Sequence, residues 1–205
     1  MIKSVGFLLA ILPGCMGALC QAPVIQRPTL GIHFFFDDFR TAWYIRNSSL
    51  RQTFRNRQFG RLKEMSPGLA INYINGLSKR YDFTTTLSGA FLDYVQRDGT
   101  SDGQDDLLLE GDVSVRGKLF TNDYWVSPYL QVGAGFSKYR GYWGTFVPLG
   151  MGLQFNLFQE AFLVINAQYR VAVTETVSNH FFYSIGLAGN IGRKRNLPTS
   201  VLPAD

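Results

Sequence analysis

Apolar and polar residues alternate along most of this chain, in segments of about ten residues separated by turn-forming sequences. In residues 147–157, one face holds Val, Leu, Met, Leu, Phe and Leu, and the other holds Pro, Gly, Gly, Gln and Asn. Such a period of two places successive side chains on opposite faces of a β-strand. The pattern predicts eight strands, at residues 30–36, 68–77, 83–95, 107–119, 126–139, 147–157, 163–173 and 182–191.

The size of the residues on the polar face predicts how the strands are oriented. A barrel in water would carry Lys and Glu outside, whereas the polar positions here are mostly Gly, Ser, Ala, Asn, Gln and Thr, which suit a crowded interior. We therefore expect an all-β fold, an eight-stranded antiparallel up-and-down transmembrane β-barrel whose apolar face meets lipid. The alternative is a soluble barrel around an apolar ligand, with the same period and the opposite orientation.

Aromatic residues gather near the ends of the segments, which is typical of the two interfacial girdles of a membrane barrel. The first predicted girdle contains Phe120, Tyr124, Trp125, Phe158 and Phe162, and the second contains Phe136, Tyr139, Tyr142, Trp143, Phe146 and Phe181.

The connections alternate in length, which predicts the topology. Short turns at 76–80, 121–125 and 158–160 belong on the periplasmic side. The connections at 37–65, 96–104, 141–145 and 175–179 then lie outside the cell, and both termini are periplasmic.

The first twenty residues are typical of a secretory signal. Lys3 precedes an apolar run from Val5 to Leu12 that is too short to span a bilayer, and Ala18-Leu19-Cys20 offers a cleavage site. We expect a signal peptide at 1–20, a barrel at 21–195 and a short periplasmic tail at 196–205. Both cysteines lie in the signal, so cleavage would leave no thiol; in the alternative interpretation, Cys15 is lipidated.

Four runs carry a resemblance to a known family: DLLLEGDVSVRGKLF, YWVSPYLQVGAGFSKY, FVPLGMGLQFNLFQEAFLVINAQYR and HFFYSIGLAGNIG. Over residues 28–192 the chain resembles the N-terminal barrel domain of OmpA-family outer-membrane proteins. The resemblance implies an outer-membrane location and a barrel architecture, and it says little about activity. Many family members continue into a peptidoglycan-binding domain, which we do not expect here because the sequence stops at Asp205. Barrels of this class usually end their last strand with an aromatic residue that the barrel-insertion machinery recognises, whereas here Ile191 and Gly192 lead into basic residues. We nevertheless expect this machinery as a partner.

One narrow stripe of the 107–119 segment is charged. Glu110, Asp112, Arg116 and Lys118 share the polar face, and Arg170 lies at a height similar to that of Glu110 on the seventh segment. Because eight strands enclose little more than their own side chains, we predict an ion-pair network across the lumen. The alternative is a conduction path.

The long connection at 37–65 is basic, and the net charge of the chain is +5. Its basic residues are Arg40, Arg46, Arg51, Arg55, Arg57, Arg61 and Lys63. Asp38 can cap a helix whose aromatic side rests on the barrel rim while guanidinium groups bind lipopolysaccharide phosphates. The alternative is a solvated basic loop.

Catalytic chemistry has little support in the sequence. Ser178, His180 and Glu175 superficially suggest an acyl hydrolase, but a catalytic triad requires convergence in space. We predict no catalytic residue, metal or cofactor, and a monomer with a structural or surface-interaction role that contacts membrane lipid and lipopolysaccharide. A narrow, low-conductance pore is the second hypothesis and a lipid-modifying hydrolase the third. Export argues against nucleic acid as a partner.

Overall fold

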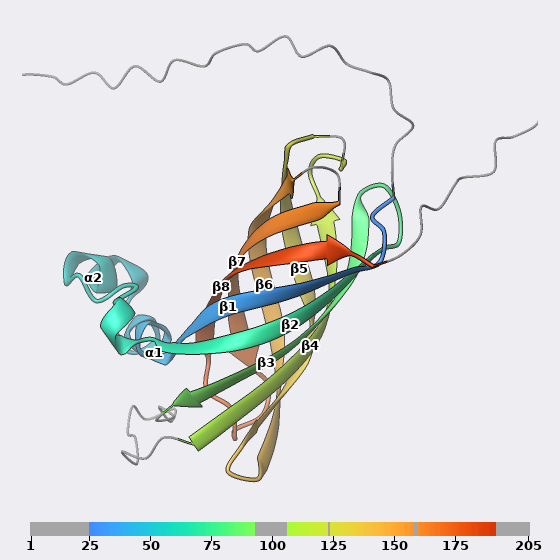
Figure 1. Ribbon diagram of the computed structural model, residues 1–205. Helices are drawn as coiled ribbons and strands as arrows, with labels where there is room; N and C mark the ends of the chain where they lie inside the picture. The colour runs from blue at the N-terminus through green and yellow to red at the C-terminus, as the bar shows by residue number, and fades with distance from the viewer. Residues whose placement is uncertain (1–24, 93–105, 123, 158–159, 192–205) are drawn as a thin grey trace, which may run out of the picture.

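The computed structural model describes residues 25–92, 106–122, 124–157 and 160–191. Eight antiparallel strands pair in chain order, and β8 pairs with β1 to close the barrel (Figure 1). They are β1 (Thr29–Asp38), β2 (Ser66–Gly76), β3 (Tyr81–Leu92), β4 (Asp106–Lys118), β5 (Val126–Tyr139), β6 (Tyr142–Leu157), β7 (Ala161–Ala172) and β8 (His180–Asn190). The predicted signal peptide, the 96–104 loop, Phe158 and the 196–205 tail lie outside the described residues.

The structure corrects one connection. An external loop was predicted at 141–145, but β6 begins at Tyr142, which pairs with Tyr139 of β5. Only Arg140 and Gly141 separate the strands, with φ values of 47° and 87°. Positive φ at both central residues is the backbone of a type I′ hairpin turn, whose twist matches that of the flanking strands. The β5–β6 hairpin is therefore tight.

Alternating exposure shows which face of each strand lies outside. In β6, Met151 is 63% exposed and Leu153 38% exposed, whereas Gln154 is only 1% exposed. The same alternation runs through the other strands, with most Leu and Ile outward and most Asn, Gln, Ser and Thr inward, while Ile74, Leu92 and Leu108 are buried on the inner face. The predicted orientation, with an apolar outer face and a mainly polar lumen, is confirmed.

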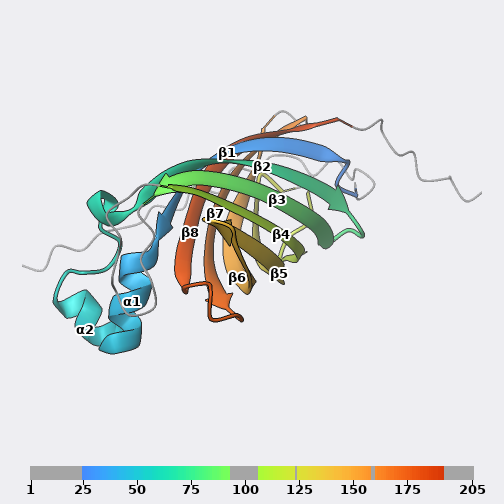
Figure 2. The same ribbon diagram turned by 90° about the horizontal axis from the view of Figure 1, so that it is seen from below.

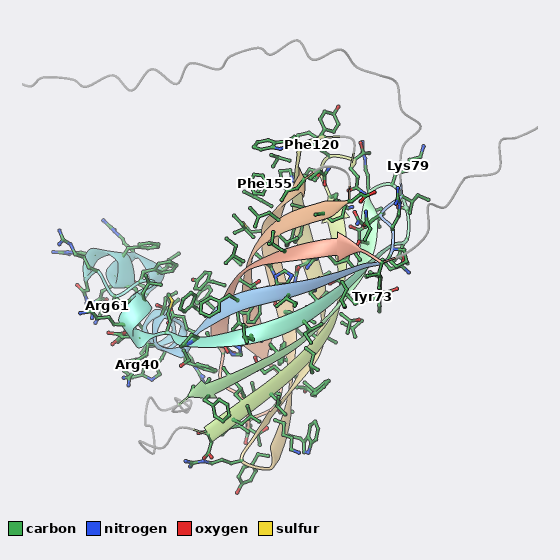
Figure 3. The ribbon with its side chains drawn as sticks, viewed as in Figure 1. Arg40, Arg61, Tyr73, Lys79, Phe120 and Phe155 are labelled. Atoms are coloured by element: carbon green, nitrogen blue, oxygen red, sulfur yellow. The ribbon has the colours of Figure 1, made fainter. Side chains whose placement is uncertain are left out.

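Three predicted girdle residues lie on the face opposite to the predicted one. Phe146 and Phe162 were assigned to the outer girdles, but they are 1% and 5% exposed. Because Val147 and Leu163 face outward, strict alternation turns their predecessors into the lumen. Tyr139 is also turned inward, because it is directly opposite the buried Leu108 and packs against the buried apolar cluster around it. The remaining girdle residues with described side chains are on the outer surface or at its rim, and Figure 3 shows Phe120 and Phe155 near one end of the barrel.

The connection from β1 to β2 is helical rather than an open loop. It contains α1 (Phe39–Asn47), α2 (Leu50–Arg55) and a short 3-10 helix at Leu62–Glu64. The predicted cap is present, because the backbone N–H of Thr41 donates to Asp38 Oδ1 at 2.8 Å. Figures 1 and 2 show α1 and α2 projecting to one side where β1 ends and β8 begins. We call this the helical end of the barrel and the opposite one the turn end.

No helix within the described ranges has the length and hydropathy needed to cross a bilayer.

Gly186 is required because the imidazole of His33 packs directly on its Cα. A Cβ added at Gly186 of β8 would lie 2.4 Å from Cγ of His33 and 2.5 Å from the Ile32 carbonyl oxygen. We expect Gly186→Ala to lower the free energy of unfolding by about 1–3 kcal/mol, because His33 and the backbone of β1 must move. Denaturant unfolding in detergent measures the change.

Gly189→Ala is the matched control in the same strand, because nothing lies within 4 Å of its added Cβ. Equal stability of the two variants would contradict the close packing of His33 on Gly186.

Candidate functional site in the lumen and the basic segment

A cluster of charged side chains fills the lumen toward the helical end. We call it the mouth cluster, and it consists of Asp37, Glu110, Asp112, Arg170 and His180, all buried. Arg170 Nη1 donates to Glu110 Oε2, and its Nη2 lies 3.4 Å from Asp112 Oδ1. The structure thus brings the predicted partners on β4 and β7 together across the lumen.

Aromatic rings enclose the Arg170 guanidinium. Its carbon lies 3.8 Å from the ring centroid of Phe182 and 5.0 Å from that of Phe146. Phe182 in turn stacks on Phe35 at 4.7 Å, in an apolar cluster that includes Leu92 and Leu108. The sequence reading had expected mostly small and polar lumen residues, so this apolar layer was missed. Because it surrounds the ion pair, it excludes water that would otherwise screen the charges.

His180 joins the mouth cluster from the first position of β8. Its Nδ1 donates to the carbonyl oxygen of Ser178 at 3.0 Å. Its Nε2 faces two carboxylates, at 3.3 Å from Glu110 Oε2 and 3.9 Å from Asp37 Oδ1. Phe39, the first residue of α1, stacks on the imidazole at 4.4 Å and covers it. The sequence analysis did not place His180 in the charged network, although its parity with Phe182 and Ser184 points into the lumen.

The predicted charged stripe divides into two separate groups. Lys118 Nζ lies 2.6 Å from Asp82 Oδ2 and donates to Asn122 Oδ1 at 2.7 Å, near the turn end. Arg116 Nε donates to Gln131 Oε1 at 3.2 Å. Neither cation forms a described ion pair with the mouth cluster, so the described ion pairs of the stripe fall at two heights in the lumen. Asp82 was missed by the sequence analysis, and its inward position on β3 was the available indication.

The suggested hydrolase residues have a different arrangement. Glu175 is exposed in the connection before β8, whereas the imidazole of His180 is fully buried beside Asp37 and Glu110. The bond between His180 and Ser178 uses the Ser178 carbonyl oxygen. Glu175 therefore does not orient His180, and these residues lack the triad arrangement that their spacing superficially suggests.

The basic residues of the 39–65 connection lie on the surface at the helical end. Arg40, Arg46, Arg51, Arg55, Arg57, Arg61 and Lys63 are all exposed. Arg61 forms an ion pair with Glu64 at 3.1 Å. Figure 3 shows Arg40 and Arg61 on this projecting segment and Lys79 at the opposite end of the barrel.

An aromatic chain joins this segment to the outer wall. Phe54 of α2 stacks on Phe59 at 4.5 Å, and Phe59 meets Phe181 of β8 edge-on at 6.0 Å. Phe181 continues the row with Tyr169 at 4.8 Å and Tyr183 at 5.9 Å on the outer face. Leu50, Phe54 and Leu62 remain exposed beside the arginines. The segment therefore combines apolar and cationic surface at the height of the barrel rim.

Comparison with known proteins bears on the fold. No protein-family model and no curated protein matches the chain. Among solved structures, Neisserial surface protein A aligns with a TM-score of 0.54 at 11% identity, over 80% of this chain and 96% of that one. The N-terminal β-barrel domain of Pseudomonas aeruginosa OprF aligns with a TM-score of 0.50 at 10% identity, over 80% and 97% of the respective chains. The chain has the eight-stranded fold of OmpA-like outer-membrane barrels.

Proposed function

We propose that this protein is an exported, monomeric, non-enzymatic barrel of the bacterial outer membrane, with a mainly structural and surface-interaction role. The main support for this proposal is the distribution of side chains around the barrel. The outer wall is apolar from Leu30 to Leu187, while ion pairs and aromatic rings fill the lumen. A closed barrel of this kind satisfies its backbone hydrogen bonds internally, as a hydrocarbon environment demands.

The filled lumen favours a structural role over the alternative of a pore. Arg170 is held between Phe146 and Phe182 and bonded to Glu110, and these side chains come from β4, β6, β7 and β8. Ions would have to displace a buried ion pair to pass through this layer. Such a displacement would leave buried charges without partners, at a cost of several kcal/mol.

The surface interaction that we propose is binding of lipopolysaccharide phosphates by the basic segment, with the helical end facing outside the cell. Three observations support it. The arginines are exposed and have few acidic neighbours, the apolar side chains of Leu50, Phe54 and Leu62 lie beside them, and the Phe54–Phe59–Phe181 contacts hold α2 against the barrel rim. Apolar residues that enter the acyl boundary would place guanidinium groups at the level of the phosphates.

Replacement of Arg51, Arg55 and Arg57 together by Gln tests this function. Each cation near an anionic surface contributes about 1 kcal/mol, so we expect lipopolysaccharide affinity to fall by roughly 100-fold at low salt. The difference should shrink as salt is raised, because exposed charges are screened. Binding of the refolded protein to lipopolysaccharide-containing vesicles measures both effects.

Lys79→Gln with Arg80→Gln is the control, because both residues are exposed in the β2–β3 turn at the other end of the barrel. Unchanged affinity of the triple variant, or an equal loss in the control, would show that the basic segment has another role.

A further inference from the structure

The mouth cluster has features of a metal site that its role as an ion-pair network does not explain. Asp37, Glu110 and His180 each offer one ligand atom, and the three atoms lie within 4.8 Å of one another. All three side chains are buried. From these residues we propose that the cluster binds a divalent transition-metal ion, with Zn²⁺ as the best fit. This inference goes beyond the proposed surface function and does not depend on it.

The hydrogen bond of His180 fixes which nitrogen faces the carboxylates. A carbonyl oxygen can only accept, so Nδ1 carries the proton that is donated to Ser178. Without a metal, a protonated imidazole donates its Nε2–H to Glu110 Oε2, which also accepts from Arg170 Nη1. Loss of the Nε2 proton leaves a lone pair that faces carboxylate oxygens of Glu110 and Asp37, and a bound cation takes the place of that proton. Histidines that bind a metal through one ring nitrogen usually donate a hydrogen bond from the other nitrogen to a carbonyl or carboxylate, as Nδ1 of His180 does here.

The spacing of the ligand atoms agrees with this assignment. Ligands about 2.0–2.1 Å from Zn²⁺ lie about 3.3 Å from one another in a tetrahedron. Nε2 of His180 lies 3.3 Å from Glu110 Oε2 and 3.9 Å from Asp37 Oδ1. A shift of the Asp37 carboxylate toward His180 and Glu110 would place the three atoms at three corners of a tetrahedron.

Asp37 supplies the second, independent observation. Both of its carboxylate oxygens are buried and have no hydrogen-bond partner, and one oxygen of Glu110 is in the same state. A buried carboxylate without a hydrogen bond is costly even with an imidazole 3.9 Å away, whereas coordination of a metal satisfies it. The side chain is directed toward His180, so the unsatisfied oxygens lie where the ion would be bound.

Formal charge also favours a divalent ion. Asp37, Glu110 and Asp112 bring three carboxylates, and Arg170 brings one guanidinium. With a neutral His180, two negative charges remain, which one divalent cation neutralises. The imidazole ligand favours Zn²⁺ over Ca²⁺ or Mg²⁺, which prefer oxygen ligands alone. The ion would join β1 and β8 to β4 on the far wall of the lumen.

The test is metal retention by the full chain refolded in detergent with Zn²⁺ present, since Phe39 covers the finished site. After gel filtration, metal analysis should find one equivalent of Zn²⁺ per parent barrel. Asp37→Asn and His180→Gln should each lower retention at least tenfold while circular dichroism shows a folded barrel. Refolding with Co²⁺ should give visible absorption bands in the parent that both variants lose.

His33→Gln is the matched control, because His33 is also buried in the lumen but is absent from the ligand set. It should retain Zn²⁺ like the parent. The proposal is overturned if the parent retains no Zn²⁺, if Asp37→Asn and His180→Gln retain as much as the parent, or if His33→Gln loses as much as they do. Lipopolysaccharide affinity is measured separately, so a failure here leaves the proposed surface function standing.

Discussion

Replacement of Arg170 by Ala is expected to destabilise the folded barrel by about 3–5 kcal/mol. The substitution leaves Glu110 and Asp112 buried with no guanidinium between them, and it removes the cation that contacts Phe182. Charges in so narrow a lumen lose hydration, and without a partner nothing offsets that loss. Thermal or denaturant unfolding in detergent measures the change beside the parent.

Arg80→Ala provides the control, since Arg80 is exposed in the β2–β3 turn and its loss should change stability by less than about 0.5 kcal/mol. Combining Arg170→Met with Glu110→Gln should recover part of the stability, because fewer buried charges then lack partners. Planar-bilayer recordings should find that the parent conducts poorly. An ion-conducting parent, together with unchanged stability of Arg170→Ala, would favour the pore hypothesis over a closed structural barrel.

Met151→Arg is expected to oppose membrane insertion by about 2–4 kcal/mol. Met151 lies well inside β6, is exposed on the outer wall, and should face the hydrocarbon core. A guanidinium at that depth loses its hydration and finds no partner in lipid. Equilibrium folding into phospholipid vesicles measures the difference between variant and parent.

Tyr142→Arg is the companion variant, since Tyr142 is exposed on the same strand at its rim. There the charge reaches interfacial water, and we expect a cost of about 0–1 kcal/mol. If the two substitutions cost the same, the outer wall of β6 does not lie in a bilayer in the proposed way.

The period-two pattern was sufficient for the strand number and the orientation, whereas the pairing of Glu110 with Arg170 also needed a count of residues from the predicted turns. Strand boundaries depend on turn geometry, and the prediction was wrong there: the connection pattern suggested an external loop at 141–145, whereas positive φ at Arg140 and Gly141 lets the hairpin close at once. Phe146 was assigned to a girdle because it is aromatic, although the alternation of the strand predicts that it faces the lumen. The alternation was the correct guide, because Val147 faces outward and Phe146 therefore faces inward.

The contents of the mouth cluster were harder to predict, since they depend on register between strands distant in sequence. His180 is opposite Arg170 because β7 and β8 pair in one particular register. Asp37 reaches the same place from the other end of the chain through the pairing of β1 with β8. Sequence periodicity shows on which face of the sheet a side chain lies. The height of that side chain relative to distant strands depends on the stagger between strands in the closed barrel.

The β1–β8 pairing also has a consequence for how the molecule folds. Thr29 and Asn190 hydrogen-bond at 2.9 Å although 161 positions separate them along the chain. Contacts of such long range make folding slow, because the whole intervening chain must be ordered before they form. Until β8 has docked, β1 and β7 each present an unpaired edge, which hydrocarbon does not tolerate. Productive assembly therefore requires that the last strand arrive while the nascent sheet is still shielded from the bilayer interior.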